Sequence, residues 1–155
     1  MIEINNTTKH KINISQITAL TERFLKTYKL SQTEVSLAIV GPNRMRNLNR
    51  DFRGIDKTTD VLSFPASASS ADKLGRAYLG EIIINPVEAS RVSKYRDMLI
   101  ELNMPPFQER EDAQQYIFNF LLVHGLLHLV GYDDHDQKER LEMLTLGRDF
   151  LKKML

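Results

Sequence analysis

The segment from His124 to Gly131 places two histidines within the most apolar stretch of the chain. His124 and His128 are four residues apart, so in a helix both side chains lie on one face, with their Cβ atoms about 5–6 Å apart. Two imidazoles at that spacing can each give a ring nitrogen to one metal ion, at about 2.0–2.1 Å. Gly131 permits a turn out of the helix, because glycine readily adopts the left-handed conformation. The segment therefore predicts an apolar, central helix over residues 108–130 that ends in a metal-binding turn.

The turn after Gly131 offers two further ligands, Asp134 and His135, that can reach the same ion. Three protein ligands and one open position are typical of a catalytic zinc site. The alternative is that the histidines are ordinary core or surface residues bonded to carbonyl groups. A pair at this spacing is less easily explained in that way, and three of the four histidines of the chain fall in this one segment. The zinc-peptidase pattern H-E-x-x-H is only half matched, because Gly125 stands where that pattern has its catalytic glutamate.

Composition limits the possible classes of protein. The 155 residues are 42% hydrophobic and 26% charged, which favours one globular domain over residues 1–155. The chain has no cysteine, so a metal would need imidazole, carboxylate or water, and a reducing cytoplasmic location is expected. The first residues do not resemble a secretory signal, and no apolar run is long enough to predict a membrane span. A net charge of +1 neither favours nor excludes a nucleic-acid partner.

Strand and helix signals alternate along the chain. Alternating apolar residues and β-branched runs predict strands, and prolines, polar caps and helical periodicity predict helices. A loop over 66–76 and a connector over 103–107 are also expected. We predict an α+β fold, in which helices pack on a mixed four-stranded sheet and a central helix carries the histidines. The predicted strands are 2–5, 35–39, 61–64 and 78–85, and the predicted helices are 15–28, 42–52, one from Pro86, 108–130 and one from Asp136.

A second polar segment precedes the third predicted strand. It is rich in positive charge, carried by Arg44, Arg46, Arg50, Arg53 and Lys57. Arginine binds phosphate oxygens in a bidentate manner, although a solvated helix face explains most of these residues equally well. Arg53 is the exception, because Gly54 and the following turn place it at the mouth of a loop. Thr58, Thr59 and Asp60 could cap this turn or line a pocket, and for Asp60 the structural role is favoured.

Three blocks together resemble the YbeY family of bacterial metal-dependent endoribonucleases, which act in ribosomal RNA maturation. The first runs from Leu48 to Pro65 and is similar to L-N-x-x-[FY]-R-x-x-D-x-P-T-D-V-L-S-F. The second is L-G-E-I-I-I-N at residues 79–85, and the third is H-G-L-L-H-L-V-G-Y-D-D-H at residues 124–135. The blocks occur in the family's order, and the resemblance extends over almost the whole chain.

The chain departs from the family pattern at two places. Thr58 replaces the family's proline, a change that a turn can accept. The family's third histidine directly follows Y-D, where this chain has Asp134, with His135 one residue later. The resemblance implies one Zn²⁺ per chain held by three imidazoles, so the predicted ligands are His124, His128 and His135, with Asp134 as the alternative third ligand.

The resemblance also implies an activity. It predicts a hydrolase that cuts single-stranded RNA in maturation of the 16S ribosomal RNA 3′ end and in ribosome quality control. The partners would then be ribosomal RNA and the small ribosomal subunit, with no DNA and no membrane. Arg53 matches the family's functional arginine and is predicted to stabilise negative charge on the phosphoryl group. Two other classes remain open, namely an RNA-binding ribosome-assembly factor with a structural zinc and, less favoured, a zinc peptidase.

Overall fold

The computed structural model describes residues 1–67 and 76–154. Its single sheet contains β1 (Ile2–Asn6), β2 (Glu34–Ile39), β3 (Val61–Pro65) and β4 (Tyr78–Ile84). The strand order is β1-β2-β4-β3. The β1–β2 and β2–β4 pairs are parallel, whereas β3 is antiparallel to β4. The predicted mixed four-stranded sheet is therefore confirmed. Most of the predicted 66–76 loop falls outside the described residues.

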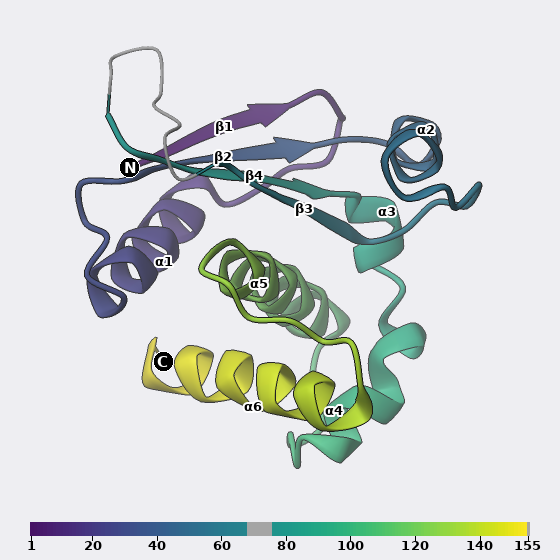
Figure 1. Ribbon diagram of the computed structural model, residues 1–155. Coiled ribbons are helices and arrows are strands. Elements are labelled where there is room, and N and C mark those ends of the chain that lie inside the picture. Colours follow the sequence, from purple (N-terminus) through teal and green to yellow (C-terminus); the bar gives the residue numbers. More distant parts are fainter. Residues whose placement is uncertain (68–75, 155) are drawn as a thin grey trace.

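Helices cover both faces of this sheet. On one face lie α1 (Ile14–Thr27) and α5 (Arg110–Leu129), and α6 (Gln137–Met154) packs against the side of α5 that faces away from the strands (Figure 1). The short segments α3 (Pro86–Ala89), η1 (Val92–Tyr95) and α4 (Arg96–Glu101) lead from β4 toward α5. On the other face, α2 (Pro42–Arg53) closes a smaller core formed by Val40, Met45, Leu62 and Ile83.

The two cores follow from the alternation of side chains along each strand. In β4, Ile82 and Ile84 join the large core with α5, while Ile83 faces the α2 side, as the two-residue period of a strand requires. The helix α5 has buried side chains around almost its whole circumference, because it lies between the sheet and α6. The prediction that the histidine helix is central is thus confirmed, although it begins at Arg110 rather than at residue 108.

Gly125 lets α5 lie unusually close to the sheet. A Cβ atom at this position would lie 2.9 Å from Cγ2 of Ile82, which is closer than van der Waals contact allows. The close approach places the carboxyl end of α5 beside β3, where Ser63 donates a hydrogen bond to the carbonyl oxygen of Gly125 at 3.5 Å. Among the described residues, no helix has the length and apolar character needed to cross a membrane.

Candidate metal centre

His124 and His128 lie one turn apart near the carboxyl end of α5, with their imidazole rings directed toward each other. The ring centroids are 4.7 Å apart and the ring planes are perpendicular. The two Nε2 atoms are separated by 3.2 Å. Both side chains are largely buried, and only 14% and 20% of their surfaces are exposed. The helical spacing has therefore brought two ring nitrogens to one point near the surface.

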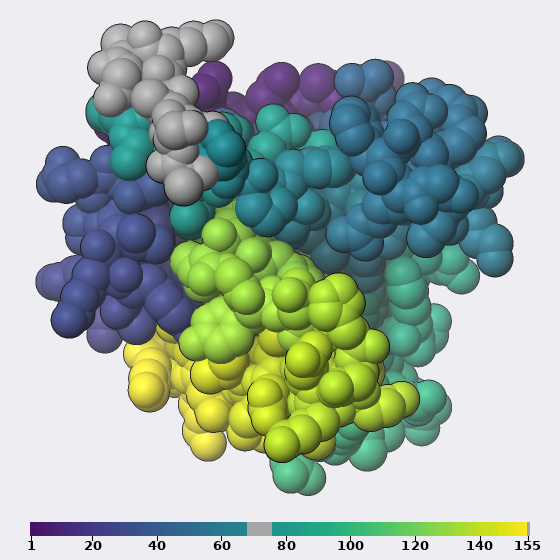
Figure 2. Space-filling model, in the orientation of Figure 1, coloured from purple at the N-terminus to yellow at the C-terminus, as the bar shows by residue number. Residues whose placement is uncertain are grey.

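Asp134 joins this pair from the loop that follows α5. Gly131, at φ 108°, reverses the chain direction, and its N–H donates to the carbonyl oxygen of His128 at 3.0 Å. The loop then brings Oδ2 of Asp134 to within 3.4 Å of Nε2 of His124 and 3.5 Å of Nε2 of His128. Figure 2 shows the end of α5 and this loop, both light green, at the surface above α6. His124, His128 and Asp134 thus form a group that could hold a metal ion.

The three facing atoms have the spacing of ligands around one ion. Two atoms that are each about 2.0–2.1 Å from a tetrahedral zinc ion lie about 3.3 Å from each other. The separations of 3.2, 3.4 and 3.5 Å between the Nε2, Nε2 and Oδ2 atoms match that triangle on all three sides. A fourth position over the triangle would stay open for water or substrate.

A backbone hydrogen bond sets the orientation and protonation of His128. Its Nδ1 lies 2.9 Å from the carbonyl oxygen of Tyr132. A carbonyl can only accept, so Nδ1 carries a proton, and Nε2 is the ring nitrogen that faces Asp134. The Tyr132 ring contacts the ring of Tyr28 at the end of α1, with centroids 6.4 Å apart. Burial, together with the hydrogen bond to Tyr132, raises the pKa of Tyr28 to about 12, so the Tyr28 hydroxyl stays protonated at neutral pH.

His124 is held in the neutral form. Burial and the neighbouring His128 lower its pKa, against the opposing effect of Asp134 and of Asp60. His124 and His128 therefore bring two ring nitrogens, and Asp134 one carboxylate oxygen, to one point. Such an arrangement repels itself unless a proton or a cation occupies that point. The donor set of two imidazoles and one carboxylate suits zinc and related divalent ions.

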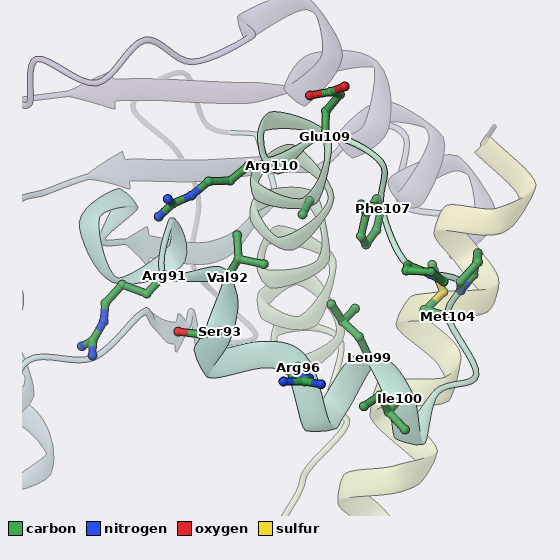
Figure 3. Close-up of a pocket in the computed structure, with 13 residues that line it drawn as sticks. Arg91, Val92, Ser93, Arg96, Leu99, Ile100, Met104, Phe107, Glu109 and Arg110 are labelled. Carbon is green, nitrogen blue, oxygen red and sulfur yellow. The ribbon is translucent and has the colours of Figure 1, made fainter.

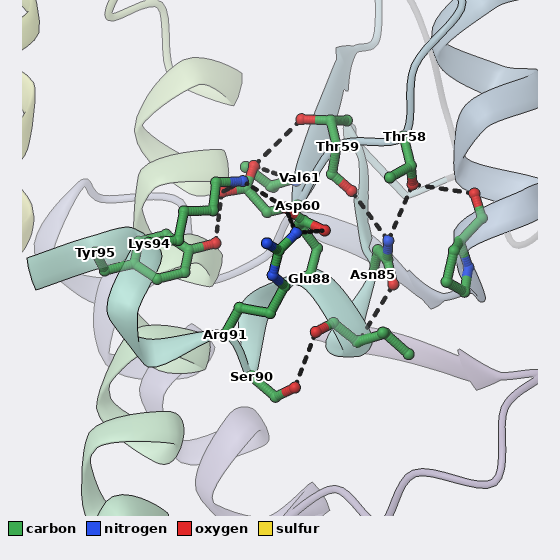
Figure 4. A network of polar contacts seen from close by, with 12 residues as sticks. Thr58, Thr59, Asp60, Val61, Asn85, Glu88, Ser90, Arg91, Lys94 and Tyr95 are labelled. Atoms are coloured by element: carbon green, nitrogen blue, oxygen red, sulfur yellow. Dashed lines mark hydrogen bonds and ion pairs between the residues drawn. The ribbon is translucent and has the colours of Figure 1, made fainter.

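Asp60 belongs to a polar network beside this centre (Figure 4). Its carboxylate accepts hydrogen bonds from the N–H of Val61 at 2.8 Å and from the hydroxyl of Tyr95 at 2.7 Å. Burial and the Asp60 charge raise the pKa of Tyr95, and Lys94 lies 3.6 Å from the same carboxylate. These contacts fit the structural role favoured from the sequence, and the Asp60 charge also acts to raise the pKa of His124.

Asn85 ties the turn before β3 to the end of β4. It is completely buried, and its side-chain amide donates to the hydroxyl of Thr58 at 3.1 Å and to the carbonyl oxygen of Thr59 at 3.2 Å. Its side-chain oxygen accepts from the N–H of Val87 at 3.2 Å and so caps α3. Sequence reasoning missed the supporting roles of Asn85 and Tyr95. An asparagine before Pro86 is a recognisable capping signal, but nothing local in the sequence indicates the partner of Tyr95.

His135 is the predicted ligand that the structure leaves apart from the pair. Its side chain is 81% exposed, and its Nε2 lies 3.5 Å from the carboxylate of Asp133. Its backbone N–H donates to the side chain of Glu139 at 3.1 Å, while Asp136 caps α6 through the N–H of Glu139 at 2.8 Å. These bonds direct the side chain of His135 away from His124 and His128. Its ligand role remains a prediction, and Asp134 has the better geometry.

Arg53 lies on a different element from the histidines. It is the last residue of α2, which Gly54 ends at φ 70°. The side chain is exposed, and within residues 1–67 and 76–154 no hydrogen bond or ion pair holds it. Its neighbour Phe52 packs edge-on against Phe64 of β3, with ring centroids 5.2 Å apart. The expected loop-mouth position is therefore observed, whereas the catalytic role of Arg53 remains a prediction.

Comparison with known proteins identifies the group to which this fold and site belong. The family described as Endoribonuclease YbeY matches residues 3–155. The chain therefore belongs to the YbeY endoribonuclease family. The sequence resemblance is confirmed over nearly the whole chain.

Individual relatives agree with this assignment. The Endoribonuclease YbeY of Acholeplasma laidlawii is 30% identical over 152 residues, covering 98% of this chain and 96% of the relative. That of Brevibacillus brevis is 35% identical over 129 residues, covering 79% and 76%. A solution structure from Thermotoga maritima superposes with a TM-score of 0.55 at 24% identity, covering 99% of this chain and 88% of the other. This last similarity supports the fold.

Proposed function

We propose that this protein is a metal-dependent endoribonuclease whose ion is held by His124, His128 and Asp134. The observation that supports the proposal most directly is the triangle of Nε2, Nε2 and Oδ2 atoms, with sides of 3.2, 3.4 and 3.5 Å. A cation would bring together the two ring nitrogens and the carboxylate oxygen that face one point, and the tetrahedral spacing with an open fourth position favours a single Zn²⁺. Membership of an endoribonuclease family supports RNA as the substrate.

Several residues of the chain would have separate roles in cutting a phosphodiester bond. The carbonyl oxygen of Tyr132 accepts from Nδ1 of His128 and so keeps Nε2 directed at the ion site. An ion bound there supplies Lewis acidity for cleavage of the phosphodiester. Arg53, which no acidic side chain in the described part of the chain neutralises, would bring positive charge to the phosphoryl oxygens as charge develops on them. The 2′-hydroxyl of the RNA or water can act as the nucleophile.

The proposed substrate is single-stranded ribosomal RNA, and the proposed process is maturation of the 16S 3′ end together with ribosome quality control. Similarity of all three sequence blocks to the YbeY family supports this assignment. The small ribosomal subunit would be the partner and the cytoplasm the location. An approximately balanced charge of +1 predicts modest RNA affinity that decreases with added salt.

The packing at Gly125 argues against the zinc-peptidase alternative. A glutamate there would need a Cβ atom 2.9 Å from Ile82, so the general base of the H-E-x-x-H pattern has no room on this side of α5. The remaining alternative is a ribosome-assembly factor that binds RNA without cutting it and uses zinc structurally. The two functions differ in whether RNA is cleaved and in whether the fold depends on the ion.

The decisive experiment combines metal analysis with RNA cleavage. Zinc content and cleavage of an end-labelled single-stranded RNA are measured for the wild type, His124→Ala, Asp134→Ala and His135→Ala. His10→Ala is the matched control, since His10 is exposed and its hydrogen bonds, to Asn6 and Thr8, use backbone atoms alone. We expect one zinc per chain in the wild type, in His135→Ala and in the control, with zinc and cleavage both lost from His124→Ala and Asp134→Ala.

Each alternative gives a different result. Loss of zinc from His135→Ala but not from Asp134→Ala would instead show that three imidazoles hold the ion. A folded wild type that binds RNA without cutting it would establish the assembly-factor function.

Arg53→Glu is expected to retain zinc and stability while cleavage falls by orders of magnitude. Arg44→Glu, an exposed arginine on the same helix, controls for the change in net charge, and equal losses in both variants would remove Arg53 from the catalytic proposal.

A further inference from the structure

An open groove lies beside the amino-terminal half of α5, away from the candidate metal centre. It has a volume of about 970 Å³ and is bounded by η1, α4, the 104–107 connector and the first turn of α5 (Figure 3). Of the residues that line the groove, Ala113 lies furthest along α5. At a rise of about 1.5 Å per residue, it lies about 16 Å from His124 along the helix axis. None of the candidate ligands lines this groove.

The floor of the groove is apolar and incompletely covered. Leu99 and Ile100 of α4, Val92 of η1, and Met104 and Phe107 of the connector line it. Ile100 is 62% exposed, and α4 has no fully buried residue. Met98 and Leu99 are partly buried against the large core, so Ile100 is the apolar α4 side chain that is available to a partner.

Three arginines border the groove. Figure 3 shows Arg91, Arg96 and Arg110 around the apolar residues, and Glu109 is the one acidic residue among those that line it. Arg91 pairs with Glu88 at 3.3 Å and is 65% exposed. Arg96 and Arg110 are exposed and make no ion pair with any residue in 1–67 or 76–154. The lining therefore has an excess of positive charge, with three arginines and one glutamate, although Asp97 and Glu111 follow Arg96 and Arg110 in the chain.

We propose that this arginine-rimmed groove is a docking site for a short amphipathic segment of a partner protein that carries both acidic and apolar side chains. Charge complementarity identifies the occupant, since free guanidinium groups pair bidentately with carboxylates. An aliphatic floor with Phe107 as its one aromatic residue suits leucine-like side chains better than nucleobases, which prefer to stack on several aromatic rings. A partner bound there leaves the metal centre open, so docking and RNA cleavage are compatible.

The test uses a displayed library of random dodecapeptides selected against the full-length protein. Peptides that also bind the double variant Arg96→Glu/Arg110→Glu are removed. We expect the remaining peptides to share at least two acidic and two large apolar residues. Fluorescence anisotropy with the synthetic peptides should show affinity reduced at least about tenfold, or about 1.4 kcal/mol, in the double variant and in Ile100→Ser. Arg23→Glu, an exposed arginine on α1, should leave the affinity unchanged.

The same variants give the outcomes that would overturn the proposal. It fails if no peptide survives the selection, or if the selected peptides are basic or bind Arg23→Glu as weakly as the double variant. It also fails if the double variant loses affinity for a single-stranded RNA oligonucleotide while no acidic peptide is selected, because the groove would then bind nucleic acid. Circular dichroism confirms folding, and Arg96→Lys/Arg110→Lys, which retains the charges, should recover most of the peptide affinity.

Discussion

Gly125 is a residue at which the histidine helix approaches the sheet closely. Its missing side chain allows Ile82 to occupy the space against α5, and His124 precedes it directly in the chain. The glycine therefore serves packing, and it fixes the height of the ligand pair above the sheet. A larger residue would move the helix and, with it, the direction of both imidazoles.

We predict that Gly125→Ala lowers the free energy of unfolding. Alanine stabilises a helix by about 1 kcal/mol relative to glycine, but overpacking a buried site costs about 1–3 kcal/mol. Gly147→Ala in α6 is the matched control, because its Cβ would meet Phe120 at a more tolerable 3.3 Å. Urea denaturation should show Gly125→Ala to be less stable than Gly147→Ala by about 1–2 kcal/mol. Equal stability of the two variants would mean that the Ile82 side chain moves aside without strain.

Glu81 gives a pH-dependent prediction. It lies on β4 opposite Phe64, and burial raises the pKa of its carboxyl group above the usual value. A raised folded-state pKa favours the protonated form, so the stabilisation is fully present below the unfolded pKa of about 4.3 and is lost as the pH rises through the folded pKa. Glu81→Gln should therefore be more stable than the wild type at pH 7, and the difference should decrease as the pH falls.

Urea midpoints measured for wild type and Glu81→Gln between acidic and neutral pH test this directly. The exposed Glu22 provides Glu22→Gln as a control for the loss of one negative charge. A stability difference between Glu81→Gln and wild type that stays constant with pH would show that burial of the charged carboxylate is not its cause.

The sequence predicted the first two candidate ligands better than the third. His124 and His128 follow from helical spacing alone, because a helix fixes the relative positions of residues four apart. The third ligand lies in a loop, whose path depends on tertiary contacts. The family pattern favoured His135, whereas the bonds of Glu139 and Asp136 at the start of α6 direct that residue outward and leave Asp134 facing the pair.

At the level of elements, the sequence identified all four strands and the long helices. Apolar alternation and proline or glycine boundaries are local signals, and they indicated these elements to within a few residues. The order β1-β2-β4-β3 depends on pairing between distant segments, which no local pattern specifies. The short η1 and α4 were not predicted, because segments of 4 and 6 residues are held by tertiary contacts rather than by their own helix propensity.

The hydrogen bonds that join the turn before β3 to the residue after β4 provide a prediction at this scale. Asn85→Ala removes the α3 cap and leaves the carbonyl of Thr59 and the N–H of Val87 without their side-chain partner. Losing a cap and burying unsatisfied groups should together cost about 2–4 kcal/mol, measured by urea denaturation. Asn47→Ala, at an exposed position of α2, should change stability little. A loss below about 0.5 kcal/mol for Asn85→Ala would mean that water replaces the amide.

For the whole molecule, the large apolar core predicts that the fold does not depend on the ion. The core joins α1, α5, α6 and the sheet, and the candidate ligands lie at its edge. Chelation should therefore lower the melting temperature without unfolding the chain. At a free zinc concentration about a thousandfold above the dissociation constant, binding stabilises by about 4 kcal/mol, which corresponds to about 10 °C for a domain of this size.

Thermal unfolding followed by circular dichroism, with zinc and with excess chelator, measures this difference. The far-ultraviolet spectrum at 25 °C should be the same in both conditions, and unfolding should stay cooperative. His124→Ala should melt at the temperature of the chelated wild type in either condition. Loss of cooperative unfolding on chelation would instead indicate a structural metal.

The division of the candidate ligands between a buried helix and an exposed loop has a kinetic consequence. His124 and His128 are fixed on α5, whereas Asp134, 38% exposed, sits on the loop that follows this helix. An ion would thus leave by detachment of the aspartate, and the exchange rate would be governed by local opening of the loop rather than by global unfolding. Loading and release of the ion would then have similar rates in water and in urea too dilute to unfold the protein. The ion would therefore exchange without unfolding of the protein.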